Sequence, residues 1–95
     1  MAQETDWDYV SKELAREWGE TSLGHSHPWD EVQDDVHFGW DQARSPEFDG
    51  AEWPDVESEI QRRWEQSFPH RGYEDWRMVG EAVRLGFNRA RGRVY

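Results

Sequence analysis

The chain has 95 residues and a formal net charge of −10, which fits one domain that repels nucleic-acid backbones and anionic membranes. It contains no cysteine, which excludes disulfides, thiolate metal sites and thiol catalysis. No apolar run approaches the ~18–20 residues of a membrane span, and the first residues are polar and acidic. We therefore expect one cytoplasmic domain over residues 1–95, without a membrane partner.

Aromatic residues mark the ends of four predicted helices, which in chain order are residues 6–18, 28–44, 53–67 and 75–91. Each contains the pattern W-x-x-V-x-x-x-[LVI]-x-x-x-[WF]. On a helix these apolar positions form one stripe about 80° wide, whereas on a strand they would scatter over both faces. The predicted core therefore contains the aromatic residues at the two ends of each stripe. They are Trp7, Trp18, Trp29, Trp40, Trp53, Trp64, Trp76 and Phe87.

The second and fourth predicted helices share a further motif, V-x-x-G-[WF]-x-x-A-R, whose glycines are Gly39 and Gly86. A glycine inside a helix costs about 1 kcal/mol relative to alanine, so its recurrence indicates close helix approach or room for a neighbouring indole, with chance as the alternative. The first and third helices share [LI]-x-R-x-W. Residues 7–44 and 53–91 are therefore interpreted as two copies of one helical hairpin. The expected fold is all-α, with four antiparallel amphipathic helices in a pseudo-two-fold bundle.

The segment from Trp53 to Arg91 carries the clearest form of the pattern, W-x-x-V-E-x-x-I-x-R-x-W and then W-x-x-V-x-x-x-V-R-x-G-F. In this form it resembles a group of small uncharacterised bacterial proteins with tandem Trp-anchored helices. The first half resembles the group less closely, because His37 stands where the second half has Arg84. The resemblance implies a helical architecture and a loose association with stress-related gene contexts, but no activity.

Two histidines before the second helix are the best candidates for metal ligands. His25, His27 and Asp30 could hold Zn²⁺ or Ni²⁺, although a closed structural site needs a fourth ligand. An exposed loop beside a proline is the simpler interpretation. The chain also lacks a phosphate-binding glycine loop and the G-x-S-x-G and H-E-x-x-H patterns. We therefore expect a protein that is not an enzyme and that binds no metal or other cofactor.

The acidic charge is concentrated in the first half of the chain. Residues 1–48 contain 12 acidic and 3 basic residues, whereas residues 49–95 contain 9 acidic and 8 basic residues. Asp30, Glu31, Asp34 and Asp35 lie close together in the second helix, mostly on its polar face. Such a half could mimic nucleic acid and occupy a DNA-binding protein, and ordinary solubility explains the charge equally well. Direct nucleic-acid binding is not expected, because the arginines of the last helix would have to outweigh a net charge of −10.

Four large apolar residues of the predicted helices fall outside the stripes, and one of them is Tyr9 on the first helix. Phe38 and Leu85 occupy the same repeat position, about 180° from the stripe, and Met78 lies near Leu85 on that back face. Either the second and fourth helices form a deeply buried central pair, or these residues form an interface with a protein partner or a second copy. The function expected from the sequence is that of a small acidic interaction protein. A nucleic-acid mimic and a metal-binding module through His25 and His27 are the alternatives.

Overall fold

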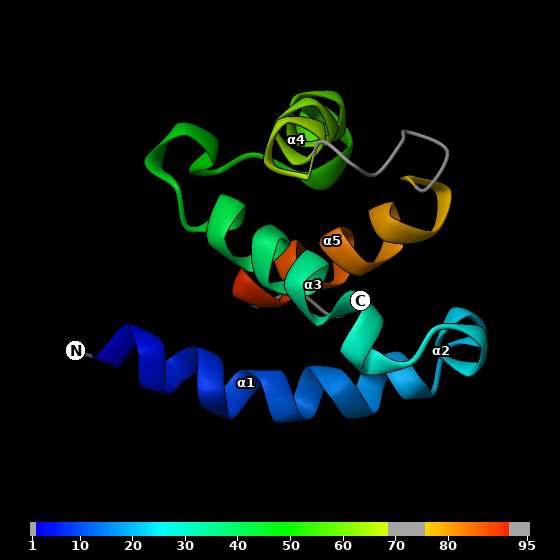
Figure 1. Cartoon of the computed structure of the whole chain (residues 1–95). Helices are drawn as coiled ribbons and strands as arrows, with labels where there is room; N and C mark the ends of the chain where they lie inside the picture. Colours follow the sequence, from blue (N-terminus) through cyan, green and yellow to red (C-terminus); the bar gives the residue numbers. More distant parts are fainter. Residues whose placement is uncertain (1, 69–75, 92–95) are drawn as a thin grey trace.

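The computed structural model describes residues 2–68 and 76–91, with side chains from Trp7 onward, and every regular element in these ranges is helical. The elements are α1 (Ala2–Gly19), α2 (Ser22–Ser26), α3 (Trp29–Ala43), the 3-10 helix η1 (Pro46–Phe48), α4 (Trp53–Ser67) and α5 (Trp76–Ala90). Figure 1 shows α3 and α5 lying against each other, with α1 on one side of this pair and α4 on the other. The all-α class expected from the sequence is confirmed. None of the described helices combines the length and apolar character needed to cross a membrane.

Four of the five α-helices lie where the sequence predicts them. The bounds of α4 match the prediction, and α3 is one residue shorter at each end. The predicted start of the last helix, residue 75, lies outside the described residues. α1 begins at Ala2 rather than at residue 6, because the apolar stripe used for the prediction has no member before Trp7.

Two short helices lie in segments that the sequence indicates only as connections, so the expected number of four helices is too low. α2 follows Thr21, whose Oγ1 accepts a hydrogen bond from the Gly24 amide at 3.0 Å. η1 begins with Pro46 after Ser45, whose Oγ accepts a hydrogen bond from the Glu47 amide at 3.4 Å. Both caps satisfy amides that the first turn of a helix leaves unpaired. Neither element is long enough to display an apolar repeat.

The central helices α3 and α5 cross at two glycines. A Cβ at Gly39 would overlap the carbonyl oxygen of Val83, and a Cβ at Gly86 would overlap the carbonyl oxygen of Val36. The two backbones therefore touch at both places, which only a residue without a side chain allows. The close approach expected from the recurring glycine is present at both positions.

The core consists of two clusters, one on each side of the central pair. The α1-side cluster contains Leu14, Trp18, Val32, Val36, Ala82 and Leu85. The α4-side cluster contains Ala43, Phe48, Trp53, Val56, Ile60, Trp64, Trp76, Val79, Val83 and Phe87. The α4-side cluster holds most of the buried aromatic rings, so a large part of the buried apolar surface lies beneath α4.

Most of the rings predicted for the core are buried in the structure. The buried rings are Trp18, Trp40, Trp53, Trp64, Trp76 and Phe87. Trp7 and Trp29 are only half-buried, and both pack at the edge of the α1-side cluster. Each is the first stripe residue of its helix, and both belong to the first half of the chain. The predicted core is therefore too large by these two rings.

Candidate interaction surface

Of the apolar residues outside the stripes, Phe38, Met78 and Leu85 lie in or against the core, whereas Tyr9 is 66% exposed. Leu85 is 1% exposed and belongs to the α1-side cluster, so it is not available to a partner in this structure. Phe38 is half-buried and makes an edge-to-face contact with Phe68, and Met78 is half-buried against both clusters. The cause is that α1 and α4 each contact both central helices and cover faces that a lone hairpin would leave open. Leu85 is therefore buried within one chain, whereas Phe38 and Met78 remain partly exposed.

The histidines near α3 do not gather around a common point. His25 is exposed, and the Nδ1 atom of the half-buried His27 lies 3.4 Å from the Oε1 atom of Glu31. The main-chain oxygen of His27 accepts a hydrogen bond from Trp18 Nε1 at 2.7 Å, which anchors the loop to α1. Asp30 is exposed and is not grouped with the histidines. Within residues 2–68 and 76–91, no group of three or more His, Asp or Glu side chains is arranged to hold a metal ion.

Arg89 of α5 and Arg91, which follows the helix, are both used inside the chain. Arg89 forms ion pairs with Glu13 and with Glu17, the latter at 2.7 Å, and thereby ties α5 to α1. Arg91 donates a hydrogen bond to the Phe48 carbonyl oxygen and lies above the ring of Phe87. These contacts hold the fold together, so Arg89 and Arg91 are not free to bind phosphate groups.

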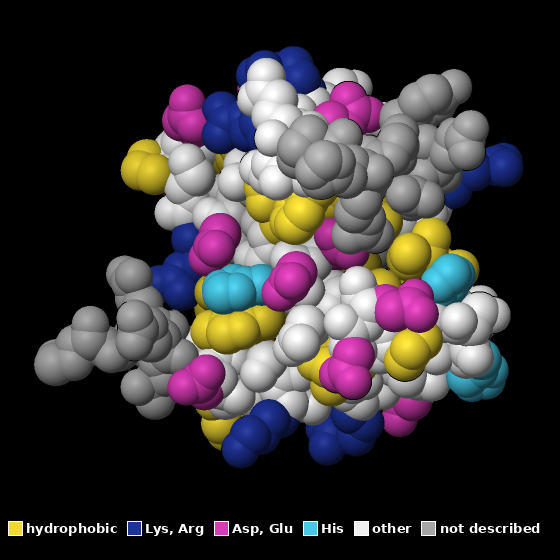
Figure 2. Space-filling model, in the orientation of Figure 1, with side chains coloured by type: hydrophobic (Ala, Val, Ile, Leu, Met, Phe, Trp, Pro, Cys, Tyr) yellow, Lys and Arg dark blue, Asp and Glu magenta, His cyan; other side chains and the backbone are white. Residues whose placement is uncertain are grey.

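The outward face of α3 carries a row of polar side chains, which we call the acidic row. Its members are Asp30, Asp34, His37 and Asp41. Spacings of four, three and four residues place them on one line along the helix. The side chains of His37 and Asp41 are 42% and 63% exposed, and Asp30 and Asp34 are exposed as well. Figure 2 shows acidic groups spread over the middle of this side of the molecule, with most Lys and Arg side chains toward its edges.

An aromatic pair lies beside the acidic row. The indole of Trp7, on α1, stacks on the His37 imidazole with a centroid distance of 4.1 Å and an angle of 8° between the rings. The His37 Nε2 atom lies 3.6 Å from the Asp41 Oδ2 atom, and the ring centroids of Trp7 and Trp40 are 5.8 Å apart. The half-exposed stack therefore adds a flat aromatic surface to a line of carboxylates. The i, i+4 spacing of His37 and Asp41 could be found in the sequence, but the stacking between α1 and α3 could not.

Asp35 differs from its acidic neighbours because it is fully buried. Its Oδ1 atom accepts a hydrogen bond from Trp64 Nε1 at 2.9 Å, so it links α3 to α4. The sequence pattern placed Asp35 and the neighbouring carboxylates mostly on the polar face of the helix. For Asp35 that expectation is wrong. The reason is that α4 covers this side of α3. Asp35 therefore belongs to the core and not to the acidic row.

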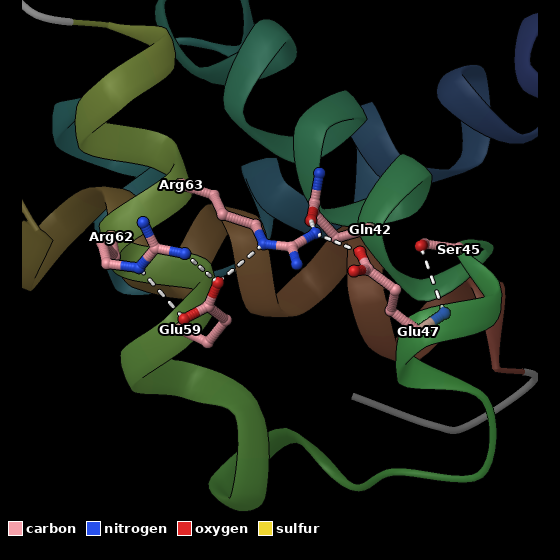
Figure 3. Close-up of polar contacts among 6 residues, drawn as sticks. All are labelled: Gln42, Ser45, Glu47, Glu59, Arg62 and Arg63. Atoms are coloured by element: carbon pink, nitrogen blue, oxygen red, sulfur yellow. Dashed lines mark hydrogen bonds and ion pairs between the residues drawn. The ribbon is translucent and has the colours of Figure 1, made fainter.

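A second polar cluster joins α4 to η1 and α3, and Figure 3 shows Arg63 at its centre. Arg63 pairs with Glu59 at 2.9 Å and with Glu47 at 2.8 Å, and its Nη1 atom donates to Gln42 Oε1 at 3.3 Å. Glu59 also accepts hydrogen bonds from Arg62. The hydrogen bonds from Arg62 and Arg63 lower the pKa of Glu59 from 4.5 to about 2. The cluster is therefore charged over the ordinary pH range, and its role is structural.

The depressed pKa of Glu59 predicts a pH-dependent contribution to stability. Because the folded-state pKa lies below the ordinary value, the contribution is present above pH 4.5 and is lost as the pH falls toward about 2. Glu59→Gln should therefore lower the urea midpoint slightly at neutral pH, by an amount that shrinks below pH 4.5. The effect is small because the pair is exposed to solvent and screened.

The matched control for this prediction is Glu20→Gln, which removes an exposed carboxylate with no such arginine contacts. A difference between Glu59→Gln and the wild type that stays constant from pH 7 to pH 3 would show that the arginine pairs do not stabilise the fold.

The described residues thus offer one unusual surface, the acidic row with the Trp7–His37 stack beside it. Exposed carboxylates of this kind accept hydrogen bonds from Arg and Lys side chains. The sequence matches no protein-family profile, no curated protein and no solved structure. The geometry of the acidic row and the Trp7–His37 stack is therefore the basis for a functional proposal.

Proposed function

We propose that this chain is a small cytoplasmic interaction protein without catalytic activity, and that it binds a basic surface of another protein through the outward face of α3. The observation that carries the proposal is the acidic row, which keeps its carboxylates exposed beside the half-exposed Trp7–His37 stack. Other polar groups of the fold are engaged in joining helices to one another, as Asp35, Arg63 and Arg89 are.

The two parts of this surface have different energetic roles. An exposed ion pair contributes only about 0–1 kcal/mol, so a line of carboxylates mainly steers a basic partner and sets its register. An aromatic side chain that becomes fully covered contributes much more, and Trp is among the residues that dominate interface energies. Trp7 is only half-buried in the free chain, so a partner that covered it would gain apolar contact.

The test is a comparison of three immobilised proteins in an extract of the native cell, with bound proteins identified by mass spectrometry. They are the wild type, the α3-face variant (Asp30→Lys, Asp34→Lys) and a control variant (Glu20→Lys, Asp49→Lys). Both variants change the net charge equally, but the control changes exposed carboxylates outside α3. We expect partners that the wild type and the control capture and that the α3-face variant loses. Capture of the same proteins by all three would contradict the proposal.

A second candidate is a nucleic-acid mimic that occupies a DNA-binding protein. The observation in its favour is that the acidic row lies in the half of the chain that holds 12 of the 21 acidic residues. The captured partner separates the two candidates. For a mimic, an excess of duplex DNA displaces the chain from its partner, whereas for an ordinary basic partner surface the complex survives at matched salt concentration.

We also propose that the chain consists of two copies of one hairpin, residues 7–44 and 53–91, related by a pseudo-two-fold axis. The matched contacts of Gly39 with Val83 and of Gly86 with Val36 support this arrangement. So does the similar separation of equivalent ring pairs, 5.8 Å for Trp7 and Trp40 and 5.5 Å for Trp53 and Phe87. The hydrogen bond between Glu17 and Arg89 also has an equivalent at the matching repeat positions, between Arg63 and Gln42. An experimental structure in which the two hairpins fail to superpose would contradict it.

A further inference from the structure

The outward faces of the two central helices differ in charge at matching positions. The acidic row of α3 has its counterpart 47 residues later in Arg77, Glu81, Arg84 and Asn88, which we call the α5 row. The same spacing of four, three and four residues places these side chains on one line of α5. Arg77 and Arg84 are exposed, and Glu81 and Asn88 are half-buried. Arg77 thus corresponds to Asp30, and Arg84 corresponds to His37.

We infer that the acidic row of one copy docks on the α5 row of a second copy. The inference rests on the proposed function, because it names a partner for the same face of α3. Charge complementarity carries it: Asp30 and Asp34 are exposed on one helix, and Arg77 and Arg84 are exposed on the other. Arg84 also has contacts within its own chain, and docking requires only that its guanidinium remain exposed at the surface.

The geometry of such a contact defines the assembly. The two docking faces belong to different helices, so each contact joins unlike surfaces and leaves one acidic row and one α5 row unused at the ends. Contacts of this heterologous kind build open chains of copies unless the rotation between neighbours closes a ring. The assembly should therefore grow with protein concentration and not stop at a dimer.

The balance of charges determines when association occurs. Each copy has a net charge of −10, which opposes association, and charges farther apart than about 8 Å are largely screened at physiological ionic strength. Ion pairs in direct contact are screened less by salt than the repulsion between the net charges of the two copies. Because exposed pairs contribute only about 0–1 kcal/mol each, association should be weak and should require protein at about 1 mM. High salt should dissociate the assembly.

The test is analytical ultracentrifugation at physiological salt, with protein up to about 1 mM, the range expected for weak contacts. The α3-face variant (Asp30→Lys, Asp34→Lys) presents basic side chains on both faces, and an α5-face variant (Arg77→Glu, Arg84→Glu) presents acidic side chains on both. We expect the wild type to associate, each variant alone to remain monomeric, and an equimolar mixture of the two to associate. The control variant (Glu20→Lys, Asp49→Lys), in which the repulsion between copies is lower, should associate at least as strongly as the wild type.

Several outcomes would overturn the inference: a monomeric wild type, variants that associate as the wild type does, or a mixture that fails to associate. Circular dichroism of each variant establishes that it is folded, and Arg77→Glu alone replaces the α5-face variant if the loss of Arg84 unfolds the chain. If the mixture stays monomeric while the extract experiment yields a partner that needs the acidic row, self-docking fails and the proposed function stands.

Discussion

Gly39→Ala and Gly86→Ala are each expected to destabilise the protein severely. A new Cβ would overlap a carbonyl oxygen of the facing helix, and the α3 and α5 backbones would have to separate. Overpacking of a core costs about 1–3 kcal/mol and occasionally more, against a total stability of about 5–15 kcal/mol for a domain. A loss above about 3 kcal/mol is expected at these sites because the obstacle is backbone, which cannot move as a side chain does.

The sign of this effect makes the test decisive. Helix propensity alone predicts the opposite result, because alanine in a helix is about 1 kcal/mol more favourable than glycine. Gly19→Ala, near the end of α1, is the matched control, since nothing lies within 4 Å of a Cβ there. Urea denaturation should therefore show a large loss for the two central glycines and little change or a small gain for Gly19. Equal or increased stability of Gly39→Ala and Gly86→Ala would show that the helices do not touch there.

Trp64→Ala is the other substitution with a large expected effect. Trp64 is fully buried, lies 5.6 Å from Trp76 between ring centroids, and donates its indole N–H to the buried Asp35. Loss of a core Trp typically costs about 3–5 kcal/mol, which would leave the chain close to unfolding. The loss should be greater than for a purely apolar position, because a donor to a buried carboxylate is removed as well.

Two further variants separate these contributions in the same denaturation experiment. Trp64→Phe keeps a ring and removes the N–H donor, so it should cost about 1–3 kcal/mol. Trp7→Ala removes a half-buried ring and should cost less than Trp64→Ala. If Trp64→Ala costs less than about 1 kcal/mol, the average for a point mutation of any kind, Trp64 does not carry the α4-side core.

The helices could be predicted from the sequence because their apolar period is local information. The stripes of α3, α4 and α5 fix their bounds to within a residue where the chain is described, and the recurrence of Gly39 and Gly86 indicated their contact. Leu85 could not be assigned in the same way. Leu85 is buried because α1 contacts α5 as well as α3. The apolar repeat within α5 carries no information about this contact.

The candidate surface was predictable only in part. The acidic composition of the first half is plain in the sequence. However, Asp34 and Asp35 are adjacent in the chain, and Asp34 is exposed whereas Asp35 is buried beneath α4. The difference arises from the indole of Trp64, 29 residues away. The stacking of Trp7 on His37 likewise depends on where α1 lies relative to α3. Long-range packing therefore selects which carboxylates remain at the surface.

The most direct measurement of the central claim is a titration of the ¹⁵N-labelled chain with the partner captured by the wild type, followed by NMR. If the outward face of α3 is the interface, the largest shifts fall on the amides of Asp30, Asp34, His37 and Asp41 and on the indole N–H of Trp7. The amides of Glu20 and Asp49, which are exposed acidic residues outside α3, should hardly move. Shifts that spread evenly over all exposed acidic residues, or that centre on another helix, would contradict the proposed function.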